Sequence, residues 1–427
     1  MVIVFPRAKR KMMLTQPKQD DKGRSMKRKL WVPIVLVLFA LAVVIIRHRE
    51  KLEEAYYWIQ LRHLNQQVLA LEKAGQNTLC ARQILTESGW LLDSTRDFGR
   101  IAGHLAALRA LLRNLSSLNA PDEQSETDGS WGKCYTEWFF KLDASFGEIS
   151  ELSDKGQVPK YPCRFLDRIN SPEKLKAHLN SLLVSDLDAD GVDHGREFNE
   201  TVADLLRLVI HHEPADYPYH PQLKEAFLDF LMNQARNTET GYWGEWYKTG
   251  DRITKTDRLS ITFHIISYLK GEITDWPKVI DTTLAIKDKR YPNGWMTHRG
   301  YANHHNMDVV VIFRYGWKHA TQRQQEAIRT ELHKMLDWCL KESLQPDGSF
   351  RLREEESLEE SVYFGTKFLS RIGYFDRTRR FWTDEEFPGA AEARQHIAQF
   401  IRAHLGSGGE GGSYYRDALA ELGERAP

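Results

Sequence analysis

A glycine-containing turn recurs along the second half of the chain at a nearly constant interval, and this repeat constrains the fold more than any other feature. The segments "DADGVD", "TGYWGEW", "YPNGWM" and "QPDGSF" place Gly191, Gly241, Gly294 and Gly348 at successive spacings of 50, 53 and 54 residues. A fifth glycine-rich segment, "GSGGEGGSYY", follows at about the same interval. A fixed period of this length indicates one supersecondary unit that is repeated several times.

Two kinds of helix alternate around these turns. An amphipathic segment precedes each turn, as in "WPKVIDTTLAIK", and a second helix follows each of the first four, as in the mostly apolar "DVVVIFRYGW". A helix with one apolar stripe lies at a surface, whereas a helix that is apolar nearly all round must be covered on both sides. The pattern therefore predicts an all-α domain over residues 125–427, an α/α toroid of repeated hairpins. We expect the turn glycines to adopt positive φ and the aromatic residues that follow them, Trp243, Trp295 and Phe350, to pack between hairpins.

One turn also resembles a known repeat. The segment "WCLKESLQPDGSF" has Gln345 ahead of Gly348 and an aromatic residue behind it, and "FLMNQARNTETGYW" is a looser copy. Over residues 165–427 this is similar to the QW-type repeat of the terpenoid cyclase/protein prenyltransferase superfamily, which implies the toroid fold. The resemblance does not extend to the acid motif of the class II cyclases, since the nearest segment reads Asp188-Ala-Asp190-Gly191.

The N-terminus reads as a membrane anchor. Residues 1–29 carry ten Lys/Arg against two Asp, and Leu30–Ile46 is an uncharged apolar run of seventeen. That length is at the short end of what crosses a bilayer, roughly 17–25 residues. No small-residue cleavage site follows, so the run predicts an uncleaved signal anchor with residues 1–29 in the cytoplasm. We expect a single-pass, N-in protein of the bacterial inner membrane with a periplasmic main domain, and no nucleic-acid partner, because no basic patch lies outside the tail.

Residues 47–124 are predicted to form a membrane-proximal helical region. A helix over 50–75 carries Leu61, Leu64, Val68 and Leu71 at a/d spacing, a stripe that could dock on the main domain or pair with a second copy of the chain. The sequence "LNAPDEQSETDGS" then indicates a loop or a domain boundary.

The four cysteines show no zinc-type spacing. In an oxidising compartment Cys134 and Cys163 could form a bridge, and free buried thiols are the alternative for these two and for Cys80 and Cys339.

Loops that lead into the apolar helices are expected to line one mouth of the toroid. They are residues 193–200, 250–257, 298–308 and 353–360, and they are rich in carboxylates and amides, which suits a polyhydroxylated ligand. The candidate substrate-binding residues are Glu197, Glu200, Asp257, Asp308 and Glu360. Helix capping is the competing explanation for such residues.

The segment "RGYANHHNMD" resembles the Asn-Asn-His motif of α/α-toroid polysaccharide lyases of the alginate lyase type, with Ala302 in place of the first Asn. The resemblance implies that an amide neutralises the uronate carboxylate while a His or Tyr removes the C5 proton. The resemblance implies a role for each of these residues. Asn303 would be the neutralising amide, and either His304 or His305 would be the base. Tyr301 would be the acid, and Arg299 would be a partner for the charge of the substrate.

Two other functions remain open. A glycoside hydrolase or epimerase would use two of the candidate carboxylates named above. For hydrolysis these two groups would lie about 5–9.5 Å apart. A non-catalytic envelope scaffold would instead use the helices of residues 50–120 as its interaction surface. His264, within "SITFHIIS", is predicted to be a core histidine.

The segment "DLDADGVDHGRE" (186–197) matches the calcium-loop template D-x-D-x-D-G-x5-E. Its ligands for Ca²⁺ would be the side chains of Asp186, Asp188, Asp190 and Glu197 and the carbonyl of Val192. Asp193 occupies a position where such loops place an aliphatic residue, and the repeat already accounts for Gly191, so a plain turn is the alternative.

Overall fold

The computed structural model describes residues 49–114, 123–211, 214, 217–352, 357–405 and 411–424. The chain divides into two compact units, residues 1–60 and 61–427, and the second unit contains all of the repeats. The predicted tail and the predicted anchor, Leu30–Ile46, lie outside the described residues. Among the helices that are described, none combines the length and the apolar character needed to cross a membrane.

The region before the repeats contains three helices, α2 (Arg49–Lys73), α3 (Leu79–Trp90) and α4 (Phe98–Arg113). Leu61, Leu64 and Val68 of the predicted a/d stripe are buried within the chain itself. Arg82 of α3 donates to Asn65 of α2 at 3.0 Å and also pairs with Glu72. These contacts join α2 to α3 within the region before the repeats, and both predicted uses of the stripe, docking on the main domain and pairing with a second copy, stay predictions.

A disulfide joins Cys80 and Cys134, so the predicted Cys134–Cys163 bridge is wrong. The loop before α5 docks on α3 through the Glu87 carboxylate, which accepts from the backbone N–H groups of Thr136 and Glu137 at 2.8 and 2.9 Å. This docking carries Cys134 to Cys80. Cys163 and Cys339 are buried, and neither takes part in a disulfide.

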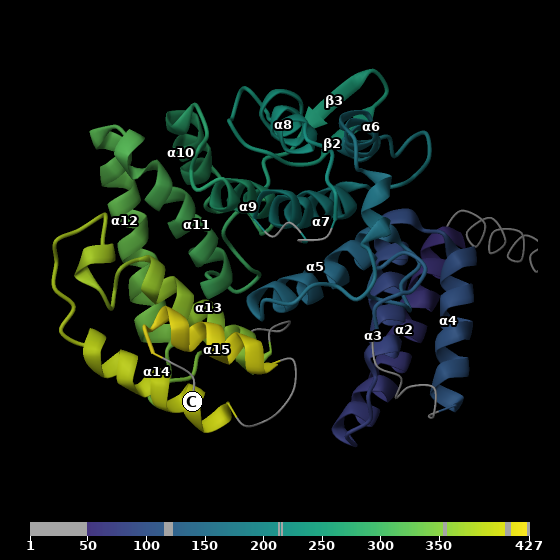
Figure 1. Cartoon of the computed structure of the whole chain (residues 1–427). Coiled ribbons are helices and arrows are strands. Elements are labelled where there is room, and N and C mark those ends of the chain that lie inside the picture. Colours follow the sequence, from purple (N-terminus) through teal and green to yellow (C-terminus); the bar gives the residue numbers. More distant parts are fainter. Residues whose placement is uncertain are drawn as a thin grey trace, which may run out of the picture. The chain divides into compact units, whose positions relative to one another are not determined.

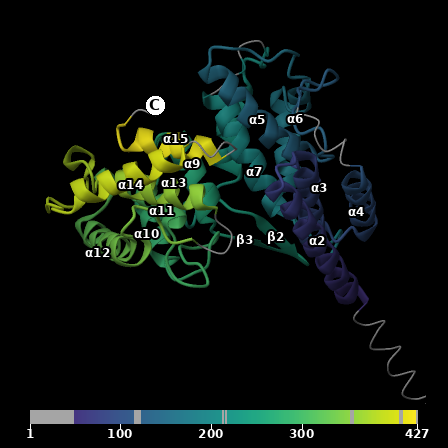
Figure 2. The same ribbon diagram turned by 90° about the horizontal axis from the view of Figure 1, so that it is seen from below.

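The repeats form two series of helices (Figures 1 and 2). We call one series the inner helices: α5 (Trp138–Asp154), α7 (Gly195–Leu205), α9 (Leu259–Tyr268), α11 (Asn303–Gly316), α13 (Leu358–Arg371) and α15 (Gly411–Glu421). The outer helices precede them in each hairpin: α6 (Pro172–Leu183), α8 (Leu223–Asp229), α10 (Trp276–Ala285), α12 (Gln322–Trp338) and α14 (Ala390–His404). Every inner helix contacts the next one in the series, from α5 through to α15.

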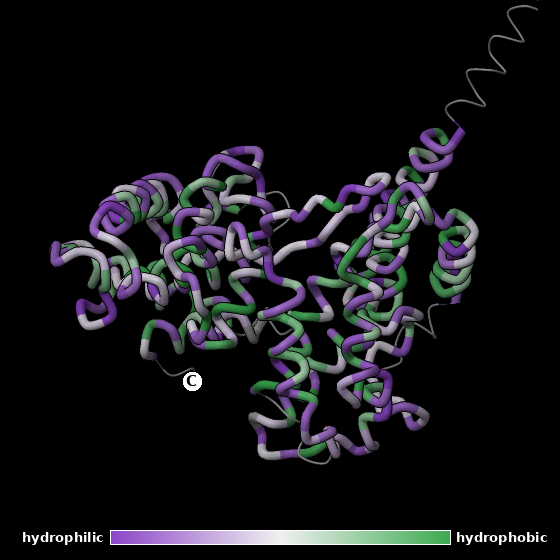
Figure 3. Tube along the Cα trace, turned by 90° about the horizontal axis from the view of Figure 1, so that it is seen from above, coloured by the Kyte–Doolittle hydropathy of each residue, from purple (hydrophilic) through white to green (hydrophobic). Residues whose placement is uncertain are grey.

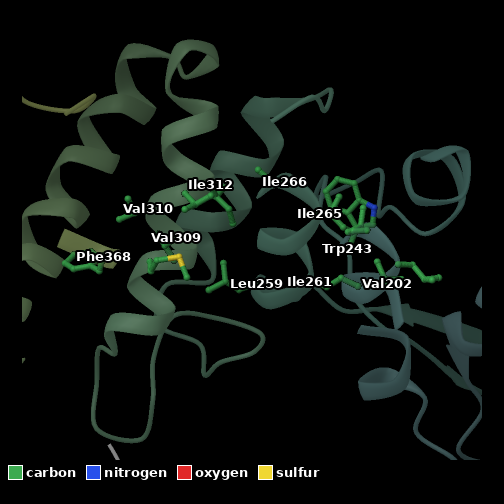
Figure 4. Packing of buried hydrophobic residues seen from close by; sticks show 14 of the residues in the cluster. Val202, Trp243, Leu259, Ile261, Ile265, Ile266, Val309, Val310, Ile312 and Phe368 are labelled. Atoms are coloured by element: carbon green, nitrogen blue, oxygen red, sulfur yellow. The ribbon is translucent and has the colours of Figure 1, made fainter. Parts of the chain in front are cut away.

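The apolar residues of α9 and α11 explain why these two inner helices are buried. Ile261 and Ile265 of α9 and Val309 and Ile312 of α11 have no exposed surface, and Figure 4 shows them in one continuous cluster. Trp243, Trp295 and Phe350 are buried as expected, and the Trp243 indole N–H donates to the carbonyl of Leu231 at 2.7 Å. Hydrophilic and hydrophobic residues alternate along most helices in Figure 3, which fits elements with one buried face.

Three of the four repeat glycines adopt the predicted positive φ, with values of 71° at Gly191, 77° at Gly241 and 89° at Gly348. Gly294 does not, and its requirement for glycine has another cause. A Cβ there would lie 2.4 Å from the carbonyl oxygen of Lys289 and 2.5 Å from that of Ile286. The turn at Gly294 therefore needs glycine for close backbone approach.

The all-α prediction holds in its coarse form, since the chain is mostly helical, but a small sheet is also present. Strand β1 (Val184–Ser185) runs parallel to β2 (Trp246–Thr249), and β2 pairs antiparallel with β3 (Arg252–Lys255). The β2–β3 hairpin turns at Gly250, whose φ of 56° a side chain would disfavour. Shorter helical turns are η1 (Leu91–Thr95), η3 (Arg164–Arg168), η4 (Leu206–His211), η5 (Phe230–Gln234), η6 (Trp317–His319), η7 (Cys339–Ser343) and η8 (Arg377–Arg379).

Candidate functional site

A pocket of about 880 Å³ opens where the inner helices α11, α13 and α15 begin, and we call it the histidine pocket. It lies at the N-terminal ends of these helices, where the sequence predicted a mouth. Four of the predicted site residues line it: Arg299, His304, His305 and Glu360. Its other lining residues are Arg290, Tyr291, Met296, Thr297, His298, Ala302, Trp338, Arg351, Leu352, Phe364 and Tyr414.

His305 is held in a defined orientation. Its Nδ1 lies 3.0 Å from the main-chain carbonyl of Trp295, and its ring stacks on Tyr291 with centroids 3.8 Å apart and planes 4° apart. Because a carbonyl oxygen can only accept, Nδ1 carries the proton of that bond. In the neutral imidazole the lone pair is then on Nε2, which is the arrangement required of a proton acceptor.

His304 is enclosed by protein at the wall of the same pocket. Its ring stacks on Phe364 with centroids 4.1 Å apart. Burial, together with the positive charge of Lys367, lowers the pKa of His304 to about 4. The imidazole is therefore neutral at physiological pH, and it is a much weaker base than an ordinary histidine.

Positive charge dominates the described lining of the pocket. Three arginines, Arg290, Arg299 and Arg351, line it together with one carboxylate, that of Glu360. Arg351 also lies 3.7 Å from the carboxylate of Glu342. Glu360 is itself committed to the start of α13, where its side chain accepts from the backbone N–H of Ser357 at 2.9 Å in a capping box. A pocket of this composition favours an anionic ligand.

Aromatic and apolar surfaces complete the wall. Trp338, Phe364 and Tyr414 come from α12, α13 and α15, and Leu352 is 53% exposed. Pockets of this kind bind the apolar faces of a ligand to rings and orient it through a few polar groups.

Three predicted residues of the same segment are directed elsewhere. Asn303 is buried and donates through Nδ2 to the hydroxyl of Ser343 at 2.9 Å, so its amide is not among the lining groups. Tyr301 is also absent from the lining, and its ring lies 6.0 Å from that of Trp338. Asp308 has no exposed surface, and the hydroxyl of Tyr291 donates to it at 3.4 Å. Asp308 therefore lies in the packing beneath the pocket and is not one of its lining residues.

The other predicted carboxylates lie on earlier repeats and outside the histidine pocket. Asp257 accepts from the Thr240 hydroxyl at 2.5 Å, and Glu197 lies 3.7 Å from the His194 ring. Their local partners are consistent with the competing explanation, that such residues order the loops and helix starts.

Glu200 belongs to a group of carboxyls on α5 and α7. Burial and the nearby Asp143 raise the pKa of Glu200, although 40% of its side-chain surface remains exposed. Burial also raises the pKa of Asp204, whose Oδ2 is buried without a hydrogen-bond partner and whose Oδ1 lies 3.8 Å from Arg207.

The structure does not assemble residues 186–197 as a calcium cage. Asp186 forms an ion pair with Lys248 at 2.6 Å, and Asp190 accepts from the backbone N–H of Val192. Glu197 is engaged with His194 instead of reaching back over the loop. Across the described ranges, no group of three or more His, Cys, Asp or Glu side chains could hold a metal ion.

Several residues that line the histidine pocket were not predicted from the sequence. Tyr291 opens the turn at Gly294 and Trp338 opens the QW-like segment, so both stood within motifs that were interpreted only for their fold. Arg351 follows Phe350 directly and Arg290 precedes Tyr291, a signal of basic residues flanking the turns that could have been noticed. Phe364 and Tyr414 carry no such signal.

No family model, no curated protein and no solved structure matches this chain. The geometry and charge of the pocket are therefore the basis for assigning a function.

Proposed function

We propose that the repeats form an α/α toroid whose histidine pocket binds an acidic polysaccharide and cleaves it by β-elimination. The observation that carries the proposal is that an oriented histidine, His305, lines the same pocket as three arginines. A uronate-containing chain supplies negative charge for the arginines and ring faces for the aromatic wall.

The proposed reaction needs a base and a group that stabilises the carboxylate of the intermediate. His305 Nε2 would remove the C5 proton of a uronate, and Arg299 would hold the carboxylate as it takes on enolate character. The C4–O4 bond then breaks as the C4–C5 double bond forms, and the imidazolium of His305 returns its proton to O4. Arg299 thus takes over the role that the motif resemblance gave to Asn303.

Export of this domain through a signal anchor is part of the proposal. Leu30–Ile46 is its sequence basis, and the Cys80–Cys134 disulfide supports it because such bonds persist in oxidising compartments.

A paired-carboxylate hydrolase is the second candidate, and the carboxyls of α5 and α7 favour it. Burial raises the pKa of Asp143, and burial together with Asp143 raises that of Glu200. A carboxyl with a raised pKa can act as a general acid near neutral pH.

Incubation of the full chain with a panel of uronate polymers tests the proposal. A lyase releases products that absorb ultraviolet light through the new double bond. A hydrolase that uses Glu200 releases reducing ends without that absorbance and loses this activity in Glu200→Gln. A scaffold gives neither signal on any polymer.

A further inference from the structure

A second pocket, of about 550 Å³, lies at the opposite ends of the same inner helices, and we call it the basic pocket. Arg314 stands two residues before the end of α11, and Arg371 is the last residue of α13. Figures 1 and 2 show α11, α13 and α15 side by side, and their contacts agree. The charged lining residues are Arg314, Lys367, Arg371, Arg379, Asp417 and Glu421.

The four cations exceed the two carboxylates, and the best-placed carboxylate is already shared. Glu421 lies 2.6 Å from Arg371 and 3.7 Å from Arg379, and it also accepts from the hydroxyl of Ser370. Little of its charge therefore remains to offset the other two cations.

Arg314 and Lys367 have no carboxylate within ion-pair distance among the described side chains. Arg314 donates to the main-chain carbonyl of Arg371 at 3.1 Å, and Lys367 donates to the hydroxyl of Tyr363. Both partners are neutral. Nε of Arg371 is a further donor, buried and without an acceptor.

The positive charges of the basic pocket repel one another. Burial lowers the pKa of Arg314, and the nearby charges of Arg371 and Arg379 lower it further. Basic residues are favourable at helix C-termini, but by only about 0.3–1 kcal/mol each. That effect does not explain why cations from three segments converge on one cavity.

We propose that the basic pocket binds a doubly charged oxyanion, a phosphate or sulfate group, with Arg314 and Lys367 as its principal ligands. Guanidinium groups bind such anions through paired N–H donors, and an ammonium adds a point charge. The bound anion would neutralise the two cations that lack a carboxylate. This site is separate from the histidine pocket and does not depend on the function proposed for it.

The test is a titration of the full chain at constant ionic strength with inorganic phosphate, inorganic sulfate, a sugar phosphate, and chloride as the reference. We expect heat of binding and a rise in the unfolding temperature with the divalent anions, and no specific effect of chloride. Tighter binding of the sugar phosphate than of inorganic phosphate would identify an esterified ligand, and the reverse a free one.

Arg314→Gln and Lys367→Gln should each weaken phosphate binding at least tenfold. Without phosphate, Arg314→Gln should unfold at or above the temperature of the wild type, because it removes a charge that its neighbours repel. Arg377→Gln, at an exposed Arg377–Glu386 pair, is the matched control and should bind as the wild type does. Equal effects of phosphate and chloride, or equal phosphate affinity in Arg314→Gln and the wild type, would overturn the assignment.

Discussion

His305 donates from Nδ1 to the main-chain carbonyl of Trp295 across 3.0 Å, and this bond ties the histidine pocket to a repeat turn. Trp295 follows Gly294, has no exposed surface, and packs within 5.9 Å of the Phe313 ring. The turn that builds the fold therefore also fixes the tautomer and the orientation of the proposed base.

The first prediction separates the two adjacent histidines. His305→Asn places an amide nitrogen close to the position of Nδ1, so it keeps a donor for Trp295 but has no basic nitrogen at Nε2. We expect this variant to fold and to lose eliminating activity by about 100-fold or more, the contribution of a general base. His304→Phe keeps a ring against Phe364 and should retain activity within about tenfold. Loss of activity in His304→Phe together with an active His305→Asn would reverse the assignment.

The second prediction concerns the arginines of the histidine pocket. Arg351→Ala and Arg290→Ala should each raise KM for an acidic polymer at least about tenfold, because a hydrogen bond to a charged group contributes about 1.5–3 kcal/mol. Arg299→Ala should lower kcat as well, since this residue is proposed to meet the reacting carboxylate. Steady-state rates at two salt concentrations provide the check: the salt dependence of KM should weaken in each variant, and an unchanged dependence would contradict an ionic role.

Much of the architecture could be predicted because period and hydrophobicity are local properties. The spacing of Gly191, Gly241 and Gly348 and the buried aromatics after the turns follow from the sequence alone. The segment 298–308 was found for the same reason, since it precedes an apolar helix and contains adjacent histidines.

What failed depended on contacts that no local pattern records. Cys134 lies beside Cys80 because Glu87 binds the segment just after Cys134, at Thr136. Asn303 faces Ser343 because of its angle at the start of α11. Phe364 reaches the histidine pocket only through the packing of α13 on α11. Asp308 looked like a mouth residue by position, yet a single turn of helix separates it from His304 and places it in the core.

The third prediction tests the disulfide. Cys80–Cys134 closes a loop across a sequence separation of 54, for which the chain-entropy estimate is about 4 kcal/mol. The Cys80→Ser/Cys134→Ser double variant should lose stability of that order in urea unfolding. The control variant Cys163→Ser keeps the Cys80–Cys134 bridge, so it should not show the loss that comes from opening this bridge. Thiol labelling of the unreduced, unfolded chain should detect two free cysteines. Four reactive thiols in protein isolated from an oxidising compartment would contradict the bond.

The fourth prediction concerns Asp308, whose pKa is raised well above its usual value by burial. The native state then holds this proton more tightly than the unfolded chain does, so the contribution of Asp308 to stability is complete below about pH 4 and declines as the pH rises toward the native pKa. Asp308→Asn keeps an acceptor for Tyr291 and removes the titration. The unfolding free energy of this variant should therefore fall less than that of the wild type as the pH rises above about 4. Parallel curves for the two proteins would exclude a protonated Asp308.

The fifth prediction has the opposite sign and concerns His264. Burial, with the charge of Arg207 as the next cause, lowers the pKa of His264 to about 3, and its Nδ1 has no hydrogen-bond partner. The unfolded chain therefore binds the proton more readily, and stability is lost as the pH falls from about 6.5 toward 3. His264→Phe keeps a ring beside Tyr268, which stacks on His264 with planes 9° apart, and removes the group that must be protonated on unfolding. Urea midpoints measured from about pH 7 to pH 4 should decline less steeply in this variant, by on the order of 2 kcal/mol over the range. An equal decline would mean that other groups account for the acid sensitivity. A loss of stability at neutral pH would mean that the imidazole makes a polar contact that phenylalanine cannot replace.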